Sequence, residues 1–87
     1  MLTGAIQTLA ARVQAQNNKF LAHDIKQFVQ TASEVMAKDA RPNISPKAKE
    51  NITQLLHIME QLPDAKTKDG QLAIKTLQSI ARDAKVG

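Results

Sequence analysis

The stretch LAHDIKQFVQTASEVM, residues 21–36, decides the fold class of this chain. Its apolar residues recur at the three- and four-residue spacing that marks one face of an α-helix. The members of this apolar stripe are Leu21, Ile25, Phe28, Val29, Ala32, Val35 and Met36. At about 100° per residue, the opposite face carries only polar side chains, among them Lys26, Gln30 and Glu34. The stretch therefore predicts an amphipathic helix with one buried face.

Proline and its neighbours set the boundaries on the C-terminal side of this stretch. Arg41-Pro42 ends the helix, because the residue before a proline is pushed out of the α region. Ser45-Pro46 begins the next helix, with serine as the N-cap and proline at the first helical position, where its missing N–H is no loss. Pro63 stops that helix, and either Asp64 or Thr67 caps a last one.

The adjacent residues Asn17 and Asn18 leave two alternatives. Two asparagines are poor in a helix and good at its boundary, which favours a turn with Asn18 as the N-cap of the following helix. Alternatively, one long helix runs through them, since Val13 and Phe20 keep the apolar spacing. That version has three helices and an exposed apolar stripe, and it implies a homodimer. Its interface would use the leftover apolar residues, such as Ile44, Ile58 and Ile74.

The turn gives an all-α fold with four helices. A chain of 87 residues makes one domain, so residues 1–87 are expected to form a single helical bundle. The apolar spacing places its helices at about 3–16, 19–40, 46–62 and 67–84. Short connections predict a small antiparallel bundle with up-down-up-down topology.

Composition excludes several classes of protein. The chain has no cysteine, which rules out disulfides, thiolate nucleophiles and cysteine-based zinc sites. The N-terminal stretch MLTGAIQTLAARVQAQ lacks the basic and apolar regions of a secretory signal. No apolar run is long enough for a transmembrane helix. We therefore expect a cytoplasmic protein without a membrane span.

The residues that commonly carry chemistry do not form a recognisable site. His23 and His57, the only histidines, fall on polar helix faces without a carboxylate four residues away, and a metal site needs three or four ligands. The carboxylates fall outside the apolar stripes, so nothing raises the pKa of a catalytic acid. The serines lack the context of a nucleophile elbow. We expect no catalytic, cofactor-binding or metal-binding residue, and no enzymatic activity.

The net charge of +4 is unevenly distributed once the chain is threaded as an up-down bundle. One end collects six basic residues, which we call the basic end: Lys38, Arg41, Lys47, Lys49, Arg82 and Lys85. Lys47 and Lys49 fall in the first turn of their helix, where the helix dipole disfavours a cation by about 0.3–1 kcal/mol. Placement against local stability occurs at functional sites; the alternative is that exposed lysines simply tolerate so small a cost. The basic end is therefore the predicted partner-binding surface.

A protein is the favoured partner. Nine glutamines give the helices polar faces suited to contacts with other helices. Nucleic acid is the alternative, because a basic end is the right electrostatic footprint. However, the chain has only two aromatic residues, too few for a stacking platform, and a charge of +4 implies weak, salt-sensitive binding. The sequence thus predicts a non-catalytic interaction module or adaptor.

Overall fold

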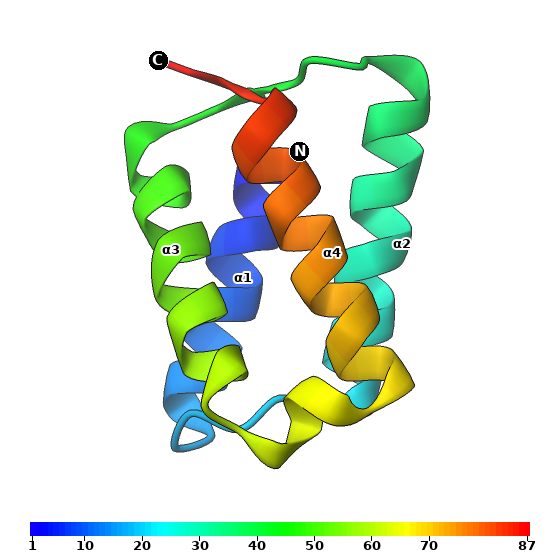
Figure 1. Cartoon of the computed structure of the whole chain (residues 1–87). Helices are drawn as coiled ribbons and strands as arrows, with labels where there is room; N and C mark the ends of the chain where they lie inside the picture. Colours follow the sequence, from blue (N-terminus) through cyan, green and yellow to red (C-terminus); the bar gives the residue numbers. More distant parts are fainter.

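The computed structural model describes all residues, 1–87, and it is almost entirely helical. Four α-helices, α1 (Leu2–Ala15), α2 (Ala22–Lys38), α3 (Pro46–Glu60) and α4 (Lys68–Asp83), make up the body of the molecule (Figure 1). A short 3-10 helix, η1 (Pro63–Lys66), connects α3 to α4. Two strands of two residues each, β1 (Asn43–Ile44) and β2 (Lys85–Val86), pair in parallel. The predicted all-α fold is confirmed.

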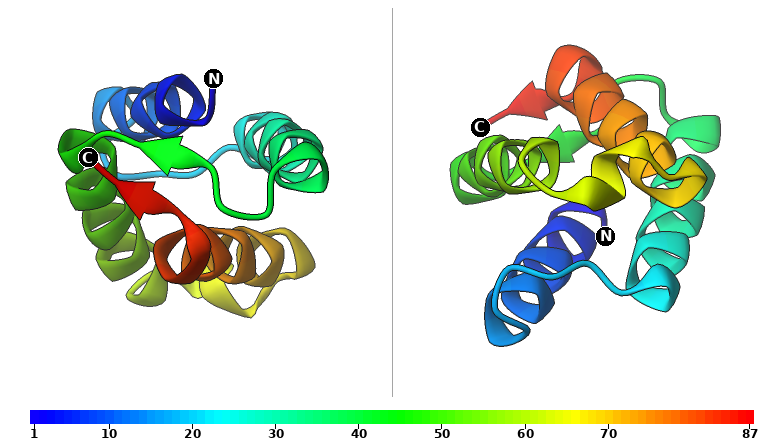
Figure 2. Two further views of the ribbon diagram at one scale, coloured as in Figure 1. Left: turned by 90° about the horizontal axis from the view of Figure 1, so that it is seen from above. Right: turned by 60° about the horizontal axis from the view of Figure 1, so that its bottom comes forward.

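Each helix packs mainly against two others. Helix α1 contacts α2 and α3, and α4 contacts the same two helices from the other side (Figure 2). These pairs are compatible with the predicted antiparallel bundle, although α2 and α3, consecutive in the chain, are not among the main packing pairs. The chain passes from α2 to α3 through residues 39–45, which run across one end of the molecule (Figure 1).

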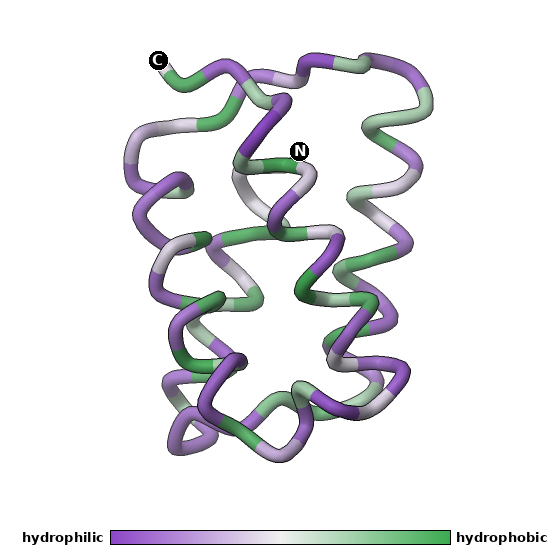
Figure 3. Tube along the Cα trace, in the orientation of Figure 1, coloured by the Kyte–Doolittle hydropathy of each residue, from purple (hydrophilic) through white to green (hydrophobic).

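A single apolar core fills the space between the helices. Figure 3 shows how apolar and hydrophilic residues alternate along each helix, as amphipathic packing requires. From the predicted stripe, Ile25, Phe28 and Ala32 are buried. Leu21, however, is 41% exposed, and the buried position in the first turn of α2 belongs to Asp24. The sequence assignment of that first turn was therefore wrong.

The connection between α1 and α2 is a turn, as the asparagines predicted. Asn17 and Asn18 both have positive φ, at 56° and 60°. The N–H of Asn18 donates to the carbonyl of Val13 at 2.9 Å, and the N–H of Asn17 donates to that of Gln14 at 3.3 Å. This is the Schellman pattern, which ends a helix by satisfying its last carbonyls. The long-helix alternative, on which the predicted homodimer depended, is wrong.

The start of α2 differs from the prediction. The helix begins at Ala22 with Leu21 in the N-cap position and no side-chain cap, so Asn18 is not the N-cap. Phe20 lies in the connection and is 5% exposed. Burial of this large aromatic side chain stabilises the connection in its non-helical path.

The segment between α2 and α3 is hydrogen-bonded to two other parts of the chain. Lys85 donates its N–H to the carbonyl of Pro42 at 2.9 Å, and the N–H of Ser45 reaches the hydroxyl of Thr3 at 3.1 Å. Ile44 is consequently only 2% exposed. It belongs to the core and not to a leftover apolar surface, while Ile58 and Ile74 are partly buried against that core.

The predicted caps of the last two helices are confirmed. Ser45 accepts a hydrogen bond from the N–H of Ala48 at 3.0 Å, and Thr67 accepts one from Gly70 at 3.0 Å. Gly70 is buried because the chain doubles back on it: a Cβ at this position would lie 1.8 Å from the carbonyl oxygen of Asp64. Only glycine permits this close approach of η1 to α4. None of the helices has the length and apolar character needed to span a lipid bilayer.

Candidate functional site at the basic end

The segments that carry the predicted basic end meet at one end of the molecule. The last turn of α2, residues 39–45, the first turn of α3 and the last turn of α4 all lie at the top of Figure 1, with β2 beside them. Strand β2 is fixed there by its pairing with β1. The six basic residues of this end therefore come from five segments that are adjacent in space but far apart in the sequence: Lys38, Arg41, Lys47, Lys49, Arg82 and Lys85.

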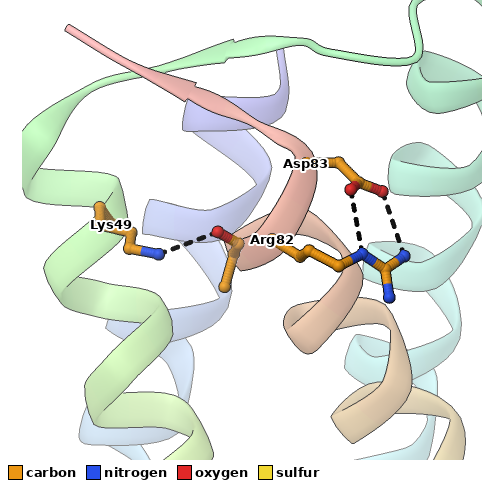
Figure 4. Close-up of polar contacts among 4 residues, drawn as sticks. Lys49, Arg82 and Asp83 are labelled. Atoms are coloured by element: carbon orange, nitrogen blue, oxygen red, sulfur yellow. Dashed lines mark hydrogen bonds and ion pairs between the residues drawn. The ribbon is translucent and has the colours of Figure 1, made fainter.

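Lys49 has a structural partner. Its Nζ donates a hydrogen bond to the carbonyl oxygen of Ala81, 3.0 Å away in the last turn of α4 (Figure 4). Carbonyls in the last turn of a helix have no partner within the helix, and the negative end of the dipole favours a cation there. The positive charge of Lys49 is unfavourable near the positive end of the α3 dipole and favourable near the negative end of the α4 dipole. Its placement is thus explained by packing between two helices.

Arg82 is also engaged. Its Nε and Nη2 lie 3.0 and 3.2 Å from the two carboxylate oxygens of Asp83, a bidentate pair between neighbouring residues (Figure 4). The hydrogen bond from Arg82 is the main cause that lowers the pKa of Asp83; burial opposes it, and the positive charges of Arg82 and Arg41 lower the pKa by less. The same hydrogen bond raises the pKa of Arg82. The charge of Arg82 is therefore largely balanced by its neighbour.

The other four cations of the basic end remain unpaired. Lys38, Arg41, Lys47 and Lys85 are exposed, and their side chains make no hydrogen bond or ion pair within the chain. The backbone N–H of Arg41 donates a hydrogen bond to the carboxylate of Asp39 at 3.0 Å, while the Arg41 side chain has no such bond. We call these four residues the free cations. They are the part of the predicted surface that is available to a partner.

A second polar cluster lies between α1 and α2 and was not predicted from the sequence. The side chain of Asp24 is only 1% exposed, and its Oδ1 lies 3.8 Å from Nη1 of Arg12 and 3.2 Å from Nε2 of His23. The expectation that no carboxylate enters an apolar stripe is wrong for Asp24. The sequence did indicate the burial of Asp24, because Asp24 lies four residues before Phe28 and therefore shares its helix face.

The histidines do not form a metal site. His23 is 72% exposed and lies 3.2 Å from the carboxylate of Asp24, while the ring of exposed His57 pairs with the side-chain amide of Gln61 at 3.0 Å. Nowhere do three His, Cys, Asp or Glu side chains gather closely enough to hold a metal ion.

Comparisons of the chain with protein-family models, with curated proteins and with solved structures give no match.

Proposed function

We propose that this chain is an antiparallel four-helix bundle that acts as a non-catalytic interaction module and binds an acidic surface of a partner protein through its basic end. The observation that carries the proposal is the set of four free cations, Lys38, Arg41, Lys47 and Lys85. They come from four separate segments at one end of the bundle. The pairing of β1 with β2 and the connection formed by residues 39–45 join these segments. Because these segments are already held in place, binding needs no ordering of the backbone, although each exposed Lys or Arg side chain still loses rotamer freedom. Charges at fixed backbone positions favour partners with a complementary arrangement of acidic groups.

A protein partner is favoured over nucleic acid by the location of the aromatic residues. Phe20 and Phe28 are both buried, at 5% and 3% exposure. The basic end therefore presents no aromatic side chain on which a base could stack. Four phosphate contacts without stacking would give weak binding that falls steeply with salt. Nucleic acid stays the alternative, and the test below distinguishes it.

The experiment compares two double variants with the same change in charge. Arg41→Glu with Lys47→Glu removes two free cations, and Lys66→Glu with Lys68→Glu alters two exposed lysines around η1 and the start of α4. Each pair takes the net charge from +4 to 0, since every substitution subtracts 2. Lys49 is kept, because its loss would disturb the packing of α3 on α4.

Both variants and the native chain are immobilised and used to capture proteins from a lysate, with and without nuclease treatment, and the captured proteins are quantified by mass spectrometry. The proposal predicts one or a few proteins captured by the native chain and by the Lys66/Lys68 variant, but lost with the Arg41/Lys47 variant. Equal capture by both variants contradicts it. Capture that disappears on nuclease treatment, together with a salt-sensitive mobility shift of labelled RNA or DNA, establishes the nucleic-acid alternative instead.

A further inference from the structure

A cleft of about 230 Å³ lies between α1 and α2. None of the six residues of the basic end lines it. Its walls combine apolar and hydrogen-bonding side chains: Leu9 and Phe28 are apolar, and Thr8, Gln27 and Thr31 are polar. Asp24 also lines the cleft. The volume is below the range of about 300–1,000 Å³ that is typical of sites for drug-sized ligands, so the cleft suits a group of the size of one side chain.

The carboxylate of Asp24 lacks the partners that its burial demands. Neither of its oxygens has a hydrogen-bond partner, and neither is reached by solvent. The guanidinium of Arg12 is 3.8 Å from Oδ1, beyond hydrogen-bond distance. His23 approaches the same oxygen, at 3.2 Å, without hydrogen-bond geometry. Oδ2, like Oδ1, has no hydrogen-bond partner in the chain. Burying a carboxylate without hydrogen-bond partners costs free energy unless another donor binds its oxygens.

From this arrangement we propose that the cleft binds a primary alkylammonium group, with the Asp24 carboxylate as its acceptor. An ammonium has three N–H donors and no acceptor. It can donate to Asp24 and to the oxygens of Thr8 or Thr31, while its alkyl chain lies against Leu9 and Phe28. Because solvent reaches neither oxygen of Asp24, the proposal requires a lining side chain to move when the ligand enters. Arg12 is the side chain that we expect to move, since it lines the cleft, lies 3.8 Å from Oδ1 and is 54% exposed. A metal ion does not fit, because Asp24 is the only carboxylate that lines the cleft.

The proposal is tested with n-butylamine, which is an ammonium ion at pH 7, and with n-butanol as its neutral counterpart. Each is titrated into the uniformly ¹⁵N-labelled native chain, and amide shifts are followed by NMR. We expect saturable shifts at residues of the cleft, such as Ala5, Leu9 and Phe28, with butylamine, and at least tenfold weaker binding of butanol. Equal responses to the two compounds, or no saturable response to butylamine, would overturn the proposal.

Matched variants locate the acceptor. Asp24→Asn removes the negative charge that lines the cleft, whereas Glu34→Gln removes a negative charge at an exposed position of α2 outside it. We expect at least tenfold weaker butylamine binding for Asp24→Asn and native binding for Glu34→Gln. Unchanged binding in Asp24→Asn rejects the assignment. If Asp24→Asn does not fold, Arg12→Gln is measured instead. Because this substitution removes the cation that competes for Asp24, we expect severalfold tighter binding of butylamine. Binding no tighter than that of the native chain counts against the proposal.

The source of the ammonium is resolved by a second ligand. A peptide with one central lysine, blocked at both ends, is titrated beside butylamine. Tighter binding of the peptide assigns the cleft to a lysine side chain of a protein, and tighter binding of butylamine assigns it to a free amine. The control is the same peptide with norleucine in place of lysine, which is expected not to bind. Binding of the norleucine peptide with equal affinity contradicts ammonium recognition.

Discussion

The ammonium group of Lys49 lies 3.0 Å from the carbonyl oxygen of Ala81 and joins the start of α3 to the end of α4. Lys47, two residues earlier in the same helix turn, is exposed and has no partner. Two lysines that look equivalent in the sequence therefore have different roles. One stabilises the bundle, and the other contributes to the free cations of the basic end.

The first prediction separates these roles by stability. Lys49→Met keeps most of the aliphatic stem but removes the hydrogen bond to Ala81, so we expect a loss of about 1 kcal/mol in the free energy of unfolding. Lys47→Met removes only a cation from the positive end of the α3 dipole and is expected to be neutral or to stabilise by up to about 0.5 kcal/mol. Urea denaturation followed by circular dichroism measures both, and equal effects of the two substitutions would refute the distinction.

Glycine at position 70 is required by space. Gly70→Ala places a Cβ against the backbone of Asp64, and the resulting shift of η1 should destabilise the chain by about 1–3 kcal/mol. Gly4→Ala is the control, because no atom lies within 4 Å of the added Cβ in α1. There alanine should be neutral or stabilise by up to about 1 kcal/mol through its better helix propensity. The midpoint of thermal unfolding should fall for Gly70→Ala and stay unchanged or rise for Gly4→Ala. A Gly70→Ala chain as stable as the native one would be incompatible with the close approach of η1 and α4.

The left-handed conformation of Asn17 gives a prediction about the first turn. With φ at 56°, glycine suits this C′ position better than asparagine. Asn17→Gly should therefore stabilise the fold by a few tenths to about 1 kcal/mol. Asn17→Val places a β-branched residue at positive φ and should destabilise it by about 1–2 kcal/mol. If valine is tolerated and glycine is not, as in a continuous helix, the turn is disproved by the same unfolding measurement.

The Arg82–Asp83 pair predicts a specific effect of pH. Because the pKa of Asp83 is lowered in the folded chain, the contribution of the pair to stability is present above the pKa of an unfolded aspartate, about 4. It is lost as the pH falls through the lower pKa of the folded state. The Arg82 side chain is 73% exposed and that of Asp83 is 36% exposed, so solvent weakens the pair, its effect on stability is small, and the pKa of Asp83 is the better observable. NMR titration of the Asp83 carboxyl carbon should give a higher midpoint in Arg82→Met than in the native chain; identical midpoints would show that the pair does not form.

The features that local sequence determines were predictable. The helix caps at Ser45 and Thr67 and the turn at Asn17 depend on neighbouring residues only, so spacing and turn propensity were enough. The apolar stripe of α2 was correct except in its first turn. There Phe20 anchors the connection, and Leu21 is left partly exposed.

The features that depend on distant segments were not predictable. Nothing in Asn43-Ile44 or Lys85-Val86 marks them as strand partners, because their pairing follows from where α4 ends in space. The burial of Ile44 follows from the same contact. For the candidate site, the sequence identified which cations share one end. It did not reveal that Lys49 is bound to α4 or that Asp24 is buried beside a cleft, since both depend on packing between helices.

The most direct test of the basic end as a binding surface is site-specific photocrosslinking. The photoreactive residue p-benzoylphenylalanine replaces exposed Ala40, in the segment that crosses the basic end, or exposed Gln14, near the end of α1. Neither replacement changes the charge. After irradiation in lysate, the account predicts a discrete protein adduct from position 40, lost when Arg41 and Lys47 are also changed to glutamate, and no such adduct from position 14. An adduct that forms from position 14 and not from position 40 would contradict it.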